Sequence, residues 1–177
     1  MSGARAVFLD RDGTLMEDVH YCGDPARVRV YPGVPEALRR LKAAGFLTFI
    51  VTNQSGIGRG LITEAQYRGV QEELLRQLGA GAIDASYFCP DLPETPSRRR
   101  KPAPGMVLEA AAEYGIDLSQ SFFIGDKADD IECGRRAGTR TVLVLTGYGA
   151  EQSCRADFTA RDVLEAVGII TRRGLSY

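Results

Sequence analysis

The sequence feature that most constrains the fold is a regular alternation of short apolar runs with longer helical patterns. Five apolar runs predict β-strands, because they are rich in β-branched and aromatic residues. Several of them show no polar alternation, which is typical of a parallel sheet covered on both faces. The predicted strands are residues 6–9, 47–51, 85–88, 122–124 and 141–145.

Helical patterns fill the segments between these strands. A candidate N-cap, Thr63, precedes one of them, and glycines such as Gly79 and Gly138 follow several, as expected at helix ends. The predicted helices are residues 34–44, 64–78, 104–114, 128–137 and 160–167. This order predicts an α/β fold, a three-layer sandwich built on a doubly wound parallel sheet.

The bulk properties predict one soluble domain over residues 1–177, since 177 residues suffice for a single core. A net charge of -1 gives no general attraction for nucleic acid or an anionic membrane, and no apolar stretch is long enough to span a bilayer. The four cysteines form no C-x-x-C pair and are expected to be free thiols. We expect a cytoplasmic protein, a monomer, with no nucleic-acid or membrane partner.

Polar residues follow three of the predicted strands. Asp10 and Asp12 follow the first strand, residues 52–55 follow the second, and Asp126 follows the fourth. Lys101 lies in the long Pro- and Arg-rich loop 90–104 after the third strand. Because ligands bind outside the carboxyl ends of parallel strands, these residues are expected to share one crevice.

Two carboxylates as close as Asp10 and Asp12 repel each other unless a cation neutralises them. Mg²⁺ prefers oxygen ligands, and Asp126 could supply a third. A carboxylate can also attack phosphorus and form an aspartyl-phosphate. We therefore assign Asp10 as the nucleophile and Asp12 as the general acid and base. The Thr52 hydroxyl and the Lys101 ammonium suit the charge on a transferring phosphoryl group.

Four sequence blocks carry a family resemblance: Asp10-Arg11-Asp12-Gly13-Thr14, and residues 52–60, 100–102 and 125–127. Their order resembles the haloacid dehalogenase-like phosphatase superfamily. The residues within these blocks are similar to those of the branch that contains D-glycero-D-manno-heptose 1,7-bisphosphate 7-phosphatases and histidinol-phosphatases. The resemblance spans residues 7–130.

The resemblance implies a set of roles. Asp10, Asp12 (through its backbone carbonyl) and Asp126 would be the magnesium ligands, and Asp10, Asp12, Thr52 and Lys101 the catalytic residues. The residues expected to bind substrate are Arg11, Asp18, His20, Tyr21, Asn53, Gln54, Ser55, Arg59, Arg100 and Lys127. Asp130 is expected to support Lys127 or the metal site.

Two features of the loops qualify this picture. No long insertion follows the first strand, so the protein resembles a capless member with an open site. Many members of the branch bind structural zinc before the Arg-Lys pair, but after Cys89 this loop has no Cys or His up to Lys101. Structural zinc needs four nitrogen or sulfur ligands, so we expect no zinc.

Several functions remain open at this stage. The leading expectation is hydrolysis of a phosphorylated sugar, namely the 7-phosphate of a heptose 1,7-bisphosphate. Histidinol-phosphatase, or another small-molecule phosphomonoesterase of the branch, is the alternative enzyme. A catalytically silent binding protein is the alternative from another class. The basic run 98–101 keeps a nucleic-acid end phosphatase open, although Arg98 and Arg99 suit a solvated loop face equally well.

Overall fold

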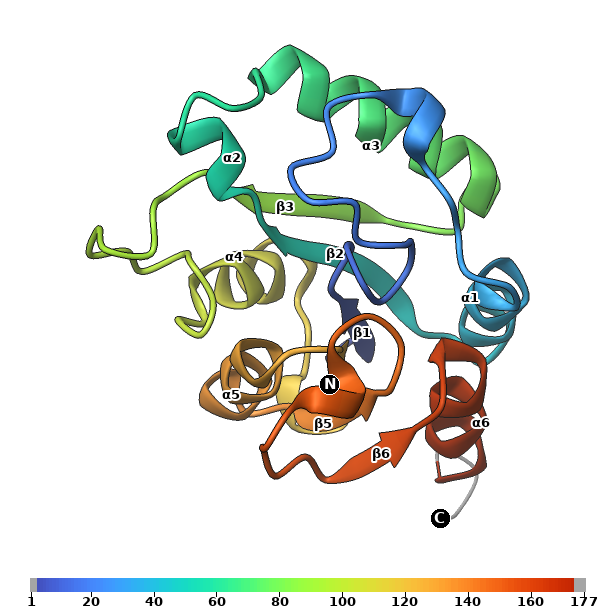
Figure 1. Cartoon of the computed structure of the whole chain (residues 1–177). Helices are drawn as coiled ribbons and strands as arrows, with labels where there is room; N and C mark the ends of the chain where they lie inside the picture. Colours follow the sequence, from blue (N-terminus) through green and yellow to red (C-terminus); the bar gives the residue numbers. More distant parts are fainter. Residues whose placement is uncertain (1–2, 174–177) are drawn as a thin grey trace.

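The computed structural model describes residues 3–173, which form a six-stranded sheet with helices on both faces (Figure 1). All neighbouring strands are parallel, in the spatial order β3-β2-β1-β4-β5-β6. The strands are β1 (Ala6–Leu9), β2 (Leu47–Asn53), β3 (Ala85–Cys89), β4 (Phe122–Gly125), β5 (Arg140–Val144) and β6 (Phe158–Ala160). The strand order reverses at β1, and a crevice at the carboxyl ends of β1 and β4 follows from that reversal.

The helices form a layer on each face of the sheet (Figure 1). On one face lie α1 (Val34–Ala43), α3 (Glu64–Leu78) and α6 (Val163–Arg173), and on the other lie α4 (Gly105–Tyr114) and α5 (Ala128–Ala137). This arrangement confirms the predicted three-layer α/β fold. Among residues 3–173, no helix combines the length and the apolar character that crossing a membrane would require.

The core consists of two apolar layers, because successive side chains of a strand point to opposite faces. Val7 and Leu9 belong to the layer under α1, α3 and α6, whereas Phe8 belongs to the layer under α4 and α5. The Phe8 ring stacks on Phe49 of β2 and Phe123 of β4, with ring centroids 5.4 and 6.4 Å apart. These contacts fix the three central strands that carry the polar residues described below.

Two helix starts follow directly from the sequence. At α3 the Thr63 hydroxyl accepts a hydrogen bond from the backbone N–H of Gln66, whose side-chain oxygen accepts one from the N–H of Thr63. At α5 the Asp130 carboxylate accepts a hydrogen bond from the backbone N–H of Lys127, 3.1 Å away. The second cap turns the Asp130 side chain back toward the end of β4.

The C-terminal region differs from the prediction. Residues 158–160 form a sixth strand, paired through Val142↔Phe158 to β5, and the last helix covers Val163–Arg173 instead of residues 160–167. The predicted start at Ala160 was wrong because that residue ends β6. A further short helix, α2 (Ser55–Gly58), occupies a segment for which no helix was predicted.

Candidate active site

A pocket of about 510 Å³ opens at the carboxyl edge of the sheet, where the loops after β1, β2, β3, β4 and β5 meet. Asp10 and Asp12 enter it from the end of β1, and Thr52 from the end of β2. Lys101 reaches it from the long loop after β3. Residues that lie far apart in the sequence therefore surround one cavity, as the strand-end argument predicted.

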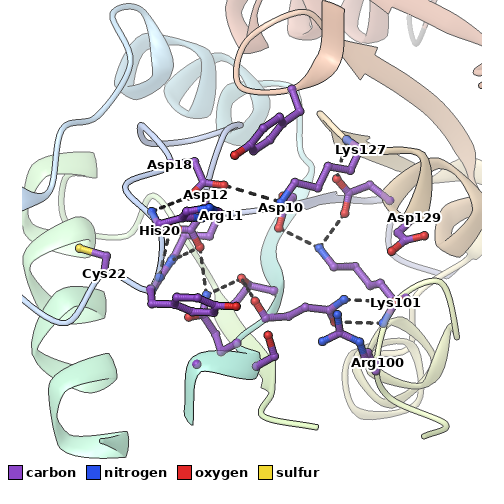
Figure 2. Close-up of a pocket in the computed structure, with 18 of the residues that line it drawn as sticks. Asp10, Arg11, Asp12, Asp18, His20, Cys22, Arg100, Lys101, Lys127 and Asp129 are labelled. Atoms are coloured by element: carbon purple, nitrogen blue, oxygen red, sulfur yellow. Dashed lines mark hydrogen bonds and ion pairs between the residues drawn. The ribbon is translucent and has the colours of Figure 1, made fainter. Parts of the chain in front are cut away.

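Lys101 and Asp10 form the buried centre of the site. Figure 2 shows their side chains directed toward one another, with the Lys101 ammonium 2.8 Å from Asp10 Oδ1. The ammonium also donates to Asp130 Oδ1 at 2.7 Å and to the backbone carbonyl of Val51 at 2.9 Å. Burial disfavours both charges, yet their attraction outweighs it: the pKa of Asp10 is lowered and the pKa of Lys101 is raised.

Three buried carboxylates, those of Asp10, Asp126 and Asp130, place oxygen atoms within 4.8 Å of one another. Burial and repulsion from Asp10 and Asp130 raise the pKa of Asp126 to about 8. Burial and Asp10 raise the pKa of Asp130 to about 6, although Lys101 opposes the shift. A single lysine does not neutralise this cluster, and a divalent cation with oxygen ligands would. The donor set therefore fits Mg²⁺.

The loop after β5 holds Asp126 in place. The Thr14 hydroxyl donates to Asp126 Oδ1 at 3.2 Å, and the backbone N–H of Tyr148 donates to Oδ2 at 3.0 Å. The Thr146 hydroxyl donates to the carbonyl of Gly13 at 2.7 Å. Two loops, after β1 and after β5, thus each donate a hydrogen bond to the Asp126 carboxylate.

Asp12 is held by two neighbours. Arg11 donates to both of its carboxylate oxygens, from Nε at 3.1 Å and from Nη2 at 3.2 Å, and Gln54 Nε2 donates to Oδ2 at 3.0 Å. The same Gln54 nitrogen donates to the Thr52 hydroxyl at 2.8 Å. The predicted acid/base residue and the predicted phosphoryl-binding threonine are therefore linked through Gln54.

The loop that carries Lys101 is anchored by polar contacts. Asn53 exchanges two hydrogen bonds with the Lys101 backbone: Asn53 Nδ2 donates to the carbonyl and the N–H donates to Oδ1, at 3.1 and 3.0 Å. The Ser97 hydroxyl accepts from the backbone N–H groups of Arg99 and Arg100. The Arg99 guanidinium donates to Glu109 of α4 and to the Phe88 carbonyl. Arg99 therefore serves the loop, whereas Arg100 lines the pocket.

The pocket mouth is formed by the loops after β1, β4 and β5. His20 and Tyr21 both have left-handed backbone conformations, with φ of 47° and 50°, and their rings stack 5.7 Å apart. The Lys127 ammonium lies 3.6 Å from Asp18 and 5.0 Å from the centre of the Tyr148 ring. Aromatic rings and the Lys127 ammonium therefore line this part of the pocket.

Most of the predicted site residues meet at this pocket. Those that line it are Asp10, Arg11, Asp12, Asp18, His20, Tyr21, Thr52, Asn53, Gln54, Ser55, Arg100, Lys101 and Lys127. Asp126 is not among the lining residues, but its carboxylate lies beside Asp10 in the cluster of three buried carboxylates described above. Arg59 is not brought to the pocket, because it ends α2 and is exposed outside the lining.

Sequence reasoning missed two residues on the loop after β5. Tyr148 and Gln152 line the pocket, and the Gln152 side-chain oxygen accepts a hydrogen bond from the backbone N–H of Ala128 at 2.9 Å. The strand-end rule could have found this loop, because it follows the carboxyl end of β5 as the other site loops follow β1, β2 and β4.

The amino-acid sequence is similar to a known family and to phosphatases of several bacteria. Residues 98–168 match the model of a family described as HAD-hydrolase-like. A D-glycero-D-manno-heptose-1,7-bisphosphate 7-phosphatase of Chlorobaculum tepidum is 37% identical over 187 residues, covering 94% of each protein. The D-glycero-beta-D-manno-heptose-1,7-bisphosphate 7-phosphatase of Yersinia pestis is 37% identical over 180 residues, covering 95% of this chain and 96% of that protein.

Solved structures of phosphatases are similar to this fold. The crystal structure of D,D-heptose 1,7-bisphosphate phosphatase from B. bronchiseptica, complexed with magnesium and phosphate, has a TM-score of 0.88 at 29% identity and covers 96% of this chain and 99% of that one. A putative HAD-like phosphatase from Mesorhizobium loti has a TM-score of 0.83 at 30% identity, covering 98% and 88%.

The doubly wound sheet and the paired aspartates after β1, with a buried lysine opposite, define a phosphoric monoester hydrolase of the haloacid dehalogenase-like class. Within that class, this chain belongs to the D-glycero-D-manno-heptose-1,7-bisphosphate 7-phosphatase family, since it is 37% identical to the Chlorobaculum tepidum and Yersinia pestis members over nearly its whole length. The predicted superfamily and branch are thus confirmed.

Proposed function

We propose that this protein removes the 7-phosphate from D-glycero-D-manno-heptose 1,7-bisphosphate, with Mg²⁺ as its cofactor. The observation that carries the proposal is the complete set Asp10, Asp12, Lys101 and Asp126 around one pocket in a chain that covers its heptose phosphatase relatives almost end to end. A catalytically silent relative would be expected to have lost at least one of these groups.

In the first step a carboxylate oxygen of Asp10 attacks phosphorus, and the bond from phosphorus to the sugar oxygen breaks. Asp12 gives its proton to that oxygen as it leaves. Lys101 fixes the Asp10 carboxylate through the 2.8 Å hydrogen bond. The product of this step is an aspartyl-phosphate on Asp10 and a free sugar hydroxyl.

In the second step Asp12, now ionised, takes a proton from a water molecule that attacks the aspartyl-phosphate. The bond between phosphorus and Asp10 breaks, and inorganic phosphate and the free Asp10 carboxylate result. Asp10, Asp126 and the backbone carbonyl of Asp12 would hold Mg²⁺. The ion would supply positive charge against the phosphoryl oxygens and against the repulsion among the buried carboxylates.

The second phosphate of the substrate is assigned to Arg100. Its guanidinium lines the pocket and is anchored by a 3.0 Å hydrogen bond to the backbone carbonyl of Asp91. Arginine offers a planar fork that suits phosphate oxygens. Lys127, at the other side of the mouth, would meet the sugar or its transferring phosphate.

The test is a phosphate-release panel in the presence of Mg²⁺. It contains heptose 1,7-bisphosphate, histidinol phosphate, hexose phosphates and a nucleotide 3′-phosphate, with Asp10→Asn as the inactive control. We expect heptose bisphosphate to be preferred by at least about 100-fold in kcat/KM. Equal, slow rates on all substrates would exclude the heptose assignment, and undiminished turnover by Asp10→Asn would exclude the nucleophile.

We further propose that the protein acts in the cytoplasm as a monomer on a small phosphorylated sugar, without a nucleic-acid partner. The loop before Lys101 would need no zinc, because Ser97 and Asn53 supply its anchors.

A further inference from the structure

The Arg11 side chain has an unusual place for a residue beside a phosphate site. It is the largest fully buried side chain among the described residues, and only 1% of its surface is exposed. Its Nε and Nη2 donate in parallel to the two carboxylate oxygens of Asp12, at 3.1 and 3.2 Å. The Asp12 side chain, 20% exposed, lies between the guanidinium and the pocket.

The far side of the guanidinium is held by α3 and β3. Arg11 Nη1 donates to Gln71 Oε1 at 3.5 Å, and Gln71 Nε2 donates to the Ser86 hydroxyl at 3.0 Å. The guanidinium also lies 5.3 Å from the centre of the Tyr67 ring, within cation–π range. A buried polar chain therefore runs from Asp12 through Arg11 and Gln71 to the sheet.

This geometry leaves Arg11 little access to a ligand. A group that is 1% exposed has no surface to offer a phosphate, and its donors already face Asp12 and Gln71. A guanidinium holds both oxygens of a carboxylate at once and so fixes the plane of the group, which a lysine ammonium cannot do. Any influence of the Arg11 side chain on the reaction must pass through Asp12.

We propose that Arg11, which also contacts Gln71, is a positioning residue that orients the Asp12 carboxylate toward the leaving-group oxygen. This inference rests on the proposed function, in which Asp12 exchanges the proton. It replaces the expectation that Arg11 binds substrate. A small misplacement of such a group can cost about 100-fold in rate, so the effect should appear in kcat and leave KM nearly unchanged.

A double-mutant cycle tests the inference, using an alkyl phosphomonoester that the wild-type protein hydrolyses. p-Nitrophenyl phosphate is unsuitable, because p-nitrophenolate leaves without needing a proton from Asp12. We expect Arg11→Met to lower kcat about 100-fold with KM within about 2-fold, and to have little further effect in the Asp12→Asn background. Arg11→Lys should not restore the rate, because it lacks the fork. A raised KM, or losses that multiply in the double variant, would show a substrate contact and overturn the inference.

A milder variant guards against misfolding. Gln71→Leu keeps Arg11 but removes its hydrogen-bond partner on α3, and should lower kcat several-fold. Gln77→Leu, six residues further along α3, serves as the matched control. Equal kcat in the two variants and the wild type would contradict the role of Gln71.

A measurement without turnover separates this inference from the proposed function. The Arg11 Nε–H signal should exchange slowly with water in the wild-type NMR spectrum and rapidly in Asp12→Asn. If the protein hydrolyses no phosphomonoester, the proposed function is wrong, but the NMR measurement still tests the pairing of Arg11 with Asp12. Equal exchange in the two proteins would overturn the Arg11–Asp12 pairing.

Discussion

The Lys101 ammonium lies 2.8 Å from Oδ1 of Asp10, and both side chains are buried. This contact joins the long loop after β3 to the first residue after β1, 91 positions apart in the chain. It brings the loop into the candidate active site. The contact also contributes to the stability of the fold, because removing one partner of a buried ion pair leaves the other charge uncompensated.

Lys101→Met should abolish turnover and also destabilise the fold. Without the ammonium, Asp10 and Asp130 are left as uncompensated buried carboxylates, which costs about 3–5 kcal/mol in Mg²⁺-free buffer. Urea unfolding measures this, with Lys42→Met as the control, since the Lys42–Asp84 pair is partly exposed and worth about 1 kcal/mol or less. Equal losses in the two variants would contradict the account.

The metal-free protein should lose stability as the pH rises from about 5 to about 8. The folded-state pKa of Asp126 is about 8, and that of Asp130 about 6, both above the ordinary 3.8. The folded protein therefore holds protons that the unfolded chain releases, so raising the pH favours unfolding in this window. The lowered pKa of Asp10 acts in the opposite sense, but below its ordinary value and outside the window.

Mg²⁺ should reverse this trend, because it binds the deprotonated carboxylates. Thermal unfolding with a chelator and with MgCl₂, at pH 5.5 and 8, measures the effect. We expect a lower midpoint at pH 8 with the chelator and a larger gain from Mg²⁺ at pH 8. A gain that is the same at both pH values would contradict a magnesium site built on these acids.

Gly13→Ala should weaken magnesium binding. Gly13 has φ of 87°, and a Cβ there would lie 2.2 Å from Asp126 Oδ2. Gly138→Ala is the control, because its φ is 91° with nothing within 4 Å of the added Cβ. Both variants should lose about 1–2 kcal/mol from backbone strain. Only Gly13→Ala should raise the Mg²⁺ concentration needed for half-maximal activity, and an equal rise in both would contradict the close approach.

Ser97→Ala should loosen the loop that carries Arg100 and Lys101. It removes the acceptor for the backbone N–H groups of Arg99 and Arg100, so the loop becomes more sensitive to proteolysis and KM rises. Ser119→Ala is the control, since that hydroxyl donates to Asp117, two residues away in an exposed turn. A zinc chelator should change neither protein. Unaltered proteolysis of Ser97→Ala would show that the loop has other anchors.

The sheet and its catalytic edge could be predicted because strand runs and strand-end motifs are local signals. Residues 6–9 are apolar throughout and residues 47–51 are apolar except for Thr48, and the two runs are followed at once by Asp10 and Thr52. The strand Phe158–Ala160 could not be predicted in this way. It has three residues, one of them exposed, and exists through its pairing with β5.

The roles of individual side chains were harder to predict, because they depend on which way a side chain turns. Arg11 stands between two site aspartates in the sequence, yet its guanidinium is buried between Asp12 and Gln71 of α3. Arg99 and Arg100 are neighbours, but one pairs with Glu109 of α4 and the other lines the pocket. Only tertiary contacts distinguish these cases.

The most direct test of the central claim is ³¹P NMR of heptose 1,7-bisphosphate incubated with the wild-type protein and Mg²⁺. The two phosphates give separate signals, one from a glycosyl phosphate and one from a primary alkyl phosphate. We expect the C7 signal to be replaced by that of inorganic phosphate while the C1 signal persists. Loss of the C1 phosphate first, or persistence of both signals, would contradict this expectation.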